Sequence, residues 1–358
     1  MPRGTRRKQM TNDQFQMTNF RRALSPRKVI AVSLVMCLAL GLVMVVSLFL
    51  GTAEISLHKI MALFSGALKD TDPTGLILFK IRLPRIILAA LVGFALSLGG
   101  VVFQALLRNP LADPFILGVS SGAAFGAILG IFFGFGFTVG VPVMAFAGAL
   151  LTVALVMTLG ARRMGMESAT ILLTGVIINA FFTAIIMFFI ATVADARLHA
   201  MLFWLYGDLS QSRYGPLVLM APLLLIAAAF LYRFAGPLNL ITAGEETALQ
   251  LGVEVERTKK ICLLIVSLIV GFAVAFSGLI GFVGLMVPHL ARMAIGSDHR
   301  LLMPVAAFGG ALFLVAADTL ARTVISPSEL PVGVITAFLG APFFIILLRK
   351  RGSRWNQS

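Results

Sequence analysis

The chain has 358 residues, of which 59% are hydrophobic and only 12% are charged. This composition excludes a soluble domain, which must keep a polar face in water, and it predicts that lipid surrounds most of the chain. The formal net charge of +14 would suit nucleic acid, but the basic residues are concentrated in the two tails, where they favour anionic lipid head groups instead.

The two tails predict the orientation of the chain. Residues 1–28 contain eight basic side chains against Asp13 alone, and residues 349–358 contain four more. Basic clusters beside membrane spans mark the cytoplasmic side, so we expect both termini in the cytoplasm and an even number of spans. The predicted organisation is a cytoplasmic tail over 1–28, a transmembrane domain over 29–350 and a second cytoplasmic tail over 351–358.

Long apolar runs predict an all-α polytopic membrane protein with about ten transmembrane helices. A bilayer core about 30 Å thick needs roughly 20 apolar residues per helical crossing, and a helix satisfies its own backbone polar groups. The first run exceeds a typical signal-peptide core and has no convincing cleavage site after it, so we interpret it as a retained span. The predicted spans are 29–50, 86–107, 115–133, 138–160, 169–193, 216–235, 260–278, 280–295, 303–322 and 332–348.

Glycine recurs at every fourth position through the third predicted span, from Gly118 to Gly134. This spacing places bare backbone along one helical face and predicts close contact with a neighbouring helix rather than a ligand site. Cys37 and Cys262 lie inside apolar runs, and the four histidines show no metal-binding spacing. A metal site built from this chain alone is therefore not expected.

The longest polar interruption within the membrane domain runs from Arg233 to Lys260. Residues 243–252 predict a short helix with Glu245 and Glu246 near its positive N-terminal end. Two interpretations remain open: a solvated connector, or a cytoplasmic element on which a partner docks.

Two basic residues at the start of the second span contradict the charge rule, because Arg82 and Arg85 fall on the outer side. Asp318 is the one acidic residue placed well inside a span, and it precedes Arg322 by one helical turn. We expect the two side chains to pair, which favours a structural role for Asp318 over a functional one.

Ordered motifs from about residue 51 to residue 350 resemble the FecCD family of importer permeases. The first half contains Ile81-Arg82-Leu83-Pro84-Arg85, the run from Gln104 to Pro114, and Leu117-Gly118-Val119-Ser120-Ser121-Gly122. The second half contains Gly244-Glu245-Glu246, Leu251-Gly252-Val253, the run from Gly278 to Leu285, Pro288-His289, Asp298-His299-Arg300, Ala317-Asp318, the run from Glu329 to Val334, and Gly340-Ala341-Pro342.

This resemblance implies the type II architecture of ABC importer permeases. The family pattern is a homodimer of ten-span subunits in the cytoplasmic membrane of a bacterium or archaeon, with the pathway at the dimer interface. Two ATP-binding subunits lie below it and a periplasmic or surface substrate-binding protein lies above. The chain contains no Walker A sequence, so ATP and Mg²⁺ are expected in the partner, and no cofactor is expected in this chain.

The resemblance also implies three groups of site residues. The stretch 238–258 matches the family's coupling element, with Glu245, Glu246, Leu251 and Gly252 at its core. Arginines that receive glutamates from the binding protein match Arg82, Arg85 and Arg322. The less favoured alternative is that these arginines reach from the helix ends to lipid phosphates. The cytoplasmic gate matches Asn109, Leu111 and Ser168. Asn109 with Pro110 would also suit an ordinary turn, and Ala169 replaces a serine of the vitamin B12 relative, so the gate chemistry departs from that pattern.

The cargo is predicted only as a class. A ferric chelate (siderophore) is expected first, with haem or cobalamin as alternatives, and an outer segment with Trp204, Tyr206 and Asp208 either contacts cargo or belongs to the aromatic belt of the membrane. A secondary transporter driven by an ion gradient would also have ten spans, but it usually needs several intramembrane carboxylates or histidines. An intramembrane enzyme is disfavoured, because no nucleophile with a base is visible.

Overall fold

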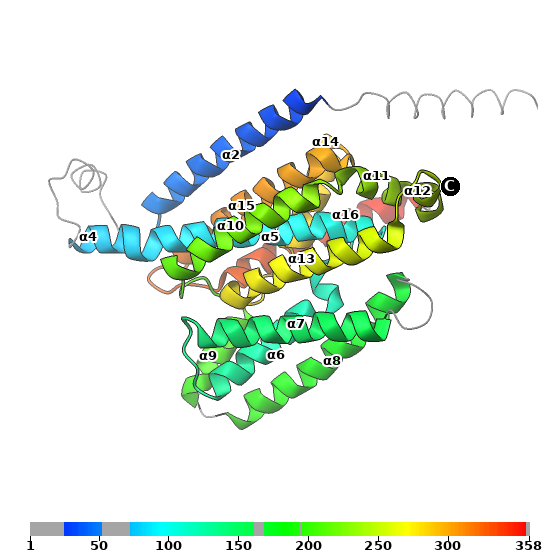
Figure 1. Ribbon diagram of the computed structural model, residues 1–358. Helices are drawn as coiled ribbons and strands as arrows, with labels where there is room; N and C mark the ends of the chain where they lie inside the picture. Colours follow the sequence, from blue (N-terminus) through cyan, green and yellow to red (C-terminus); the bar gives the residue numbers. More distant parts are fainter. Residues whose placement is uncertain (1–24, 52–71, 161–167, 194, 356–358) are drawn as a thin grey trace, which may run out of the picture.

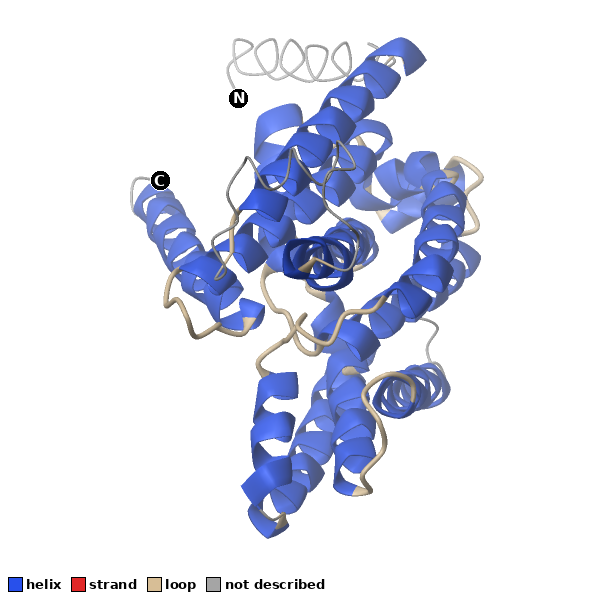
Figure 2. Ribbon diagram, turned by 90° about the vertical axis from the view of Figure 1, so that its left-hand side faces the viewer, coloured by secondary structure: helices blue, strands red, loops and turns tan. Residues whose placement is uncertain are grey.

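The computed structural model describes residues 25–51, 72–160, 168–193 and 195–355. Within these ranges the regular elements are all helical (Figure 2), which confirms the predicted all-α fold. In chain order they are α2 (Pro26–Phe49), α4 (Pro73–Gly75), the π-helix η1 (Leu76–Arg82), α5 (Leu83–Leu106), the 3-10 helix η2 (Pro114–Leu117), α6 (Val119–Phe132), α7 (Gly140–Gly160), α8 (Ser168–Thr192), α9 (Asp195–Leu205), α10 (Tyr214–Tyr232), α11 (Ala235–Ala243), α12 (Glu245–Gln250), α13 (Val255–Ser277), α14 (Val283–Ile295), α15 (His299–Thr323) and α16 (Val332–Trp355).

The ten predicted spans correspond one to one to apolar helices. Among the described residues, seven helices are long and apolar enough to cross a membrane, and three shorter apolar ones cover Val119–Phe132, Val283–Ile295 and Val332–Leu347. Most ends agree within a few residues. The second helix is the main exception, because it continues from Pro73 to Leu106 instead of beginning at residue 86.

The helix of α5 forms the centre of the bundle. In the most apolar window of Pro73–Leu106, 83% of the residues are buried, whereas none of the corresponding window of α2 is buried. Gly93 of α5 and Gly310 of α15 approach so closely that a Cβ on either one would overlap the other's carbonyl. Such backbone contact brings α15 directly against α5, which is how small residues allow membrane helices to pack.

The glycine pattern of the third span produces the close packing that was predicted. A Cβ added to Gly122 would overlap the Gly148 carbonyl of α7, and one added to Gly126 would overlap the Met144 carbonyl. Gly118 lies just before α6 with a φ of 76°, a left-handed conformation that glycine adopts without strain. The repeat therefore joins α6 to α7, and its first glycine also starts the helix.

Two ends of the bundle matter for the functional site. We call the end formed by η1, the start of α5 and the end of α15 the arginine end. The connector is the segment from α11 through α12 to the residue before α13, residues 235–254, and the end that carries it is the connector end. Figure 1 shows α4, which precedes η1, at one extreme of the bundle and α12 at the other. Two short helices were not predicted from the sequence: α9 in the 194–214 segment, and α11 before the predicted 243–252 helix.

Candidate functional site

The arginine end contains a buried cluster of charged side chains, which we call the arginine cluster: Arg82, Arg85, Asp318, Arg322 and Glu329. The Asp318 carboxylate lies between two guanidinium groups, with Oδ1 at 2.9 Å from Arg85 Nε and Oδ2 at 3.1 Å from Arg322 Nε. The predicted pairing of Asp318 with Arg322 is confirmed. Arg85 is a second partner that the sequence did not indicate, because it comes from a helix 233 residues away.

Two arginines of the cluster also cap the C-terminal end of α2. The last carbonyls of a helix have no partner within the helix. Arg82 Nη1 donates to the Leu48 carbonyl at 2.9 Å, Arg322 Nη1 donates to the Leu50 carbonyl at 3.2 Å, and Arg322 Nη2 donates to Ser47 Oγ at 2.8 Å. These cations suit the negative C-terminal end of the α2 dipole, so the cluster attaches α2 to α5 and α15.

Glu329 is the part of the cluster that reaches the surface. Its Oε2 lies 2.5 Å from Arg85 Nη1, and its side chain is 36% exposed, whereas the Arg85 side chain is 5% exposed. Arg82, Arg85 and Arg322 were predicted to receive carboxylates from a docking partner. In the isolated chain they are buried and bonded to this chain's own groups, and Glu329 already occupies one face of Arg85.

The connector end carries the second set of predicted residues, on α12 and the turn after it. Glu245 and Glu246 stand in the first turn of α12, as predicted, and Gly252 ends the segment with a φ of 84°. Glu245 Oε2 lies 2.7 Å from Lys259 Nζ at the start of α13, whereas Glu246 is exposed. Leu251 is 62% exposed, so the connector presents an apolar side chain beside an acidic one to its surroundings.

The predicted gate residues lie between α5 and α6 and at the start of α8. Asn109 Oδ1 accepts the Leu111 N–H at 2.9 Å, which is the turn that the Asn-Pro sequence suggested, and Leu111 is 38% exposed. Ser168 is the first residue of α8, and its side chain lies outside the described part of the chain. Their role in a gate therefore stays a prediction.

Asp113 is a polar group of this segment that sequence reasoning did not single out. Its Oδ1 accepts the Phe115 N–H at 2.9 Å and so caps η2. Desolvation disfavours the charged carboxylate and raises the pKa of Asp113 from 3.8 to about 6, although the Phe115 hydrogen bond acts in the opposite direction. The carboxyl group can therefore change its protonation state near neutral pH.

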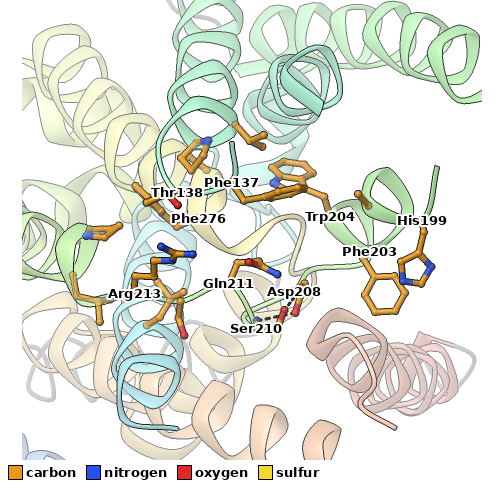
Figure 3. A pocket seen from close by; sticks show the side chains of 18 residues that line it. Phe137, Thr138, His199, Phe203, Trp204, Asp208, Ser210, Gln211, Arg213 and Phe276 are labelled. Carbon is orange, nitrogen blue, oxygen red and sulfur yellow. Dashed lines mark hydrogen bonds between the residues drawn. The ribbon is translucent and has the colours of Figure 1, made fainter. Parts of the chain in front are cut away.

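A cavity of about 330 Å³ opens near α9 and the segment that follows it. Figure 3 shows Trp204, Asp208 and Arg213 around it, together with the hydrogen bond between Asp208 and Ser210. Trp204 is only 7% exposed and forms part of the cavity wall. Tyr206 is 48% exposed and does not line this cavity.

A second hollow of about 590 Å³ lies between α6, α8 and α9. Its polar lining consists of hydroxyl and amide groups, from Ser120, Ser121, Asn179 and Thr183, and the other lining side chains are apolar. The Ser120 Oγ is buried without a hydrogen-bond partner.

Among the described residues no group of three or more histidine, cysteine, aspartate or glutamate side chains could hold a metal ion.

The arrangement of helices is that of an ABC transporter permease. A solved structure described as "an inward-facing conformation of a putative metal-chelate type ABC transporter" matches with a TM-score of 0.79 and 33% sequence identity, over 89% of this chain and 99% of that one. Residues 38–350 match the FecCD transport family, so the chain belongs to that family. This confirms the resemblance that the ordered motifs indicated.

Two relatives with different names illustrate the range of the family. The cobalamin import system permease protein of Halobacterium salinarum is 44% identical over 274 residues, which cover 76% of this chain and 73% of that protein. The hemin transport system permease protein of Yersinia pestis is 40% identical over 322 residues, which cover 87% of this chain and 95% of that protein. Relatives with different cargoes thus share most of this chain's length.

Proposed function

We propose that this chain is the membrane subunit of an ATP-driven importer and that its cargo is a ferric chelate. Two copies form the pathway between them, which opens alternately to the two sides of the cytoplasmic membrane. Two ATP-binding subunits, which hold the ATP and Mg²⁺, dock at the connector end, and a substrate-binding protein docks at the arginine end. The names of the relatives support the importer class, and the description of the solved structure as a metal-chelate type transporter favours a ferric chelate as the cargo.

One observation carries this proposal: the connector end, with its exposed acidic side chain, and the arginine end, with its charged cluster, lie at opposite ends of one helical bundle. The exposed acidic and apolar surface of α12 suits a protein partner. Figure 1 shows α12 at the opposite extreme of the bundle from α4, which directly precedes the η1 helix that ends at Arg82. Guanidinium groups bind carboxylates in a directed way, so an acidic side chain of a partner can take the place of Glu329 on Arg85 at the arginine end. An importer needs one partner on each side of the membrane.

The hollow between α6 and α8 supports a pathway that is weakly selective. Its hydroxyl and amide groups can hydrogen-bond a cargo without attracting a particular charge, and its apolar groups allow a bulky molecule to pass. Selectivity then resides mainly in the binding protein. Haem or cobalamin would pass by the same route, which agrees with the cargoes named for the relatives.

The proposal is tested by reconstituting the chain with its ATP-binding subunits and binding protein in liposomes. We expect a labelled ferric siderophore to accumulate only when ATP and the loaded binding protein are both supplied. Parallel assays with haem and cobalamin identify the cargo. Uptake by the chain alone, driven by a proton or sodium gradient, would instead support a secondary transporter.

A further inference from the structure

The connector is hydrogen-bonded to the start of α15 through one side chain, Asn239 of α11. Its Nδ2 donates to Asp298 Oδ1 at 2.8 Å. Its Oδ1 accepts the backbone N–H of His299 at 2.8 Å and lies 2.7 Å from His299 Nδ1. The Asn239 amide thus uses both its donor and its acceptor on two consecutive residues at the beginning of α15.

These contacts are built into the helix start itself. Asp298 is the N-cap of α15, and the same Oδ1 accepts the Arg300 N–H at 3.0 Å. His299 is 1% exposed, so water does not readily replace its bond to Asn239. A shift of α11 alone by about 1 Å would take these bonds beyond hydrogen-bonding distance. The bonds therefore persist only if the start of α15 moves together with α11.

The other end of α15 carries Asp318 and Arg322 of the arginine cluster. The helix has 25 residues, which at about 1.5 Å per residue makes it about 37 Å long, enough to cross a bilayer core. Along its length it packs against α5 through Gly310 and Gly93. One continuous helix is therefore bonded to the connector at its first residue and to the arginine cluster at its last turn.

We propose that Asn239 is the positioning residue that couples the connector to α15, and that α15 carries movement of the connector to the arginine cluster. This inference rests on the proposed function, because it needs an ATP-binding subunit at α11 and α12 and a binding protein at the other end. Coupling between distant sites requires an element that both sites bias, and α15 contacts both. Loss of the Asn239 bonds should weaken the coupling without preventing assembly.

The test compares three variants in the reconstituted importer. Asn239→Leu removes all of the hydrogen bonds at similar size, and Asn239→Asp places a second carboxylate against Asp298. The double variant Asn239→Asp with Asp298→Asn exchanges the amide and the carboxylate between the two positions. The repulsion between two carboxylates is thereby removed, and the asparagine at position 298 supplies an amide donor. The matched control is Thr158→Val on α7, outside the docking element, because the Thr158 hydroxyl bonds only to carbonyls of α7 itself.

The expected readout is a loss of coupling in complexes that still assemble. For Asn239→Asp and Asn239→Leu, we expect stimulation of ATP hydrolysis by the loaded binding protein to fall about ten-fold, with normal co-purification of the ATP-binding subunits. Asp298→Asn should restore most of the stimulation to Asn239→Asp, and Thr158→Val should behave as the unsubstituted chain does.

Three other outcomes separate the inference from the proposed function on which it rests. If assembled Asn239→Asp and Asn239→Leu complexes are stimulated as strongly as the unsubstituted complex, the coupling role of Asn239 is wrong while the importer stands. If the double variant is no better than Asn239→Asp, the pairing with Asp298 is not the basis of coupling. If the unsubstituted chain assembles with no ATP-binding subunit, the proposed function itself fails.

Discussion

Replacement of Asp318 by asparagine tests the arginine cluster most sharply. The substitution keeps the shape of the side chain, but it leaves Arg85 and Arg322 buried without the carboxylate that lies 2.9 and 3.1 Å from their Nε atoms. Each charge-assisted hydrogen bond contributes about 1.5–3 kcal/mol. Since the asparagine amide can accept from one arginine but presents a donor to the other, we expect a loss of about 3–5 kcal/mol, the usual cost of breaking a buried ion pair.

The assay is thermal unfolding of the purified chain in lipid nanodiscs, followed by the fraction that remains monodisperse. The control is Thr323→Val, one turn further along α15, because the Thr323 hydroxyl bonds only to carbonyls of its own helix. We expect Asp318→Asn to lower the unfolding temperature by several degrees and Thr323→Val to leave it almost unchanged. Equal unfolding temperatures for Asp318→Asn and the unsubstituted chain would refute the structural role of the cluster.

Three further predictions concern the two ends of the bundle. Glu329→Gln should free one face of Arg85 and tighten docking of an acidic binding protein about two- to five-fold, measured by surface plasmon resonance. Glu246→Lys should lower ATP hydrolysis about five-fold when the ATP-binding subunit is supplied at a limiting concentration. Glu246 is chosen because it is exposed, whereas Glu245 is paired within the chain. Asp113→Asn should keep the cap on η2 but remove a pH dependence of stability. Because the pKa of Asp113 is raised in the folded state, the unsubstituted chain should lose stability as pH rises from about 4 through 6. The unfolding temperature at several pH values measures this difference.

Each of these three has a clear contrary result. Weaker docking of Glu329→Gln would mean that Glu329 itself contacts the partner. Unaltered hydrolysis by Glu246→Lys would remove that residue from the interface with the ATP-binding subunit. A parallel pH profile for Asp113→Asn and the unsubstituted chain would show that Asp113 titrates near its ordinary pKa.

The sequence predicted the spans well because lipid imposes a simple length and polarity rule on each helix. Helix ends were less predictable where polar residues continue a helix past its apolar run. Thus α13 begins at Val255 and contains Lys259, whose ammonium group is buried against Glu245. The continuous helix from Pro73 was missed for a related reason, since Lys80, Arg82 and Arg85 interrupt its hydropathy.

The site was predictable as a set of residues but not as a set of contacts. Asp318 and Arg322 pair across one helical turn, a spacing that sequence alone reveals. The bonds of Arg85 to Asp318 and of Asn239 to Asp298 join helices far apart in the chain, and no local pattern specifies them. The burial of the three arginines likewise depends on how α2 meets α5 and α15.

The central claim is that the connector and the arginine end face opposite sides of the membrane, and two-sided cysteine labelling tests it most directly. In a background with Cys37 and Cys262 replaced by alanine, Leu251→Cys and Tyr206→Cys each place one thiol at an exposed position. Leu251 lies on the connector, and the Tyr206 carbonyl lies against Gly333, four residues after Glu329 of the arginine cluster. In intact cells, a membrane-impermeant maleimide should label Tyr206→Cys at once and Leu251→Cys only after permeabilisation. Labelling of both thiols from the same side would contradict the account.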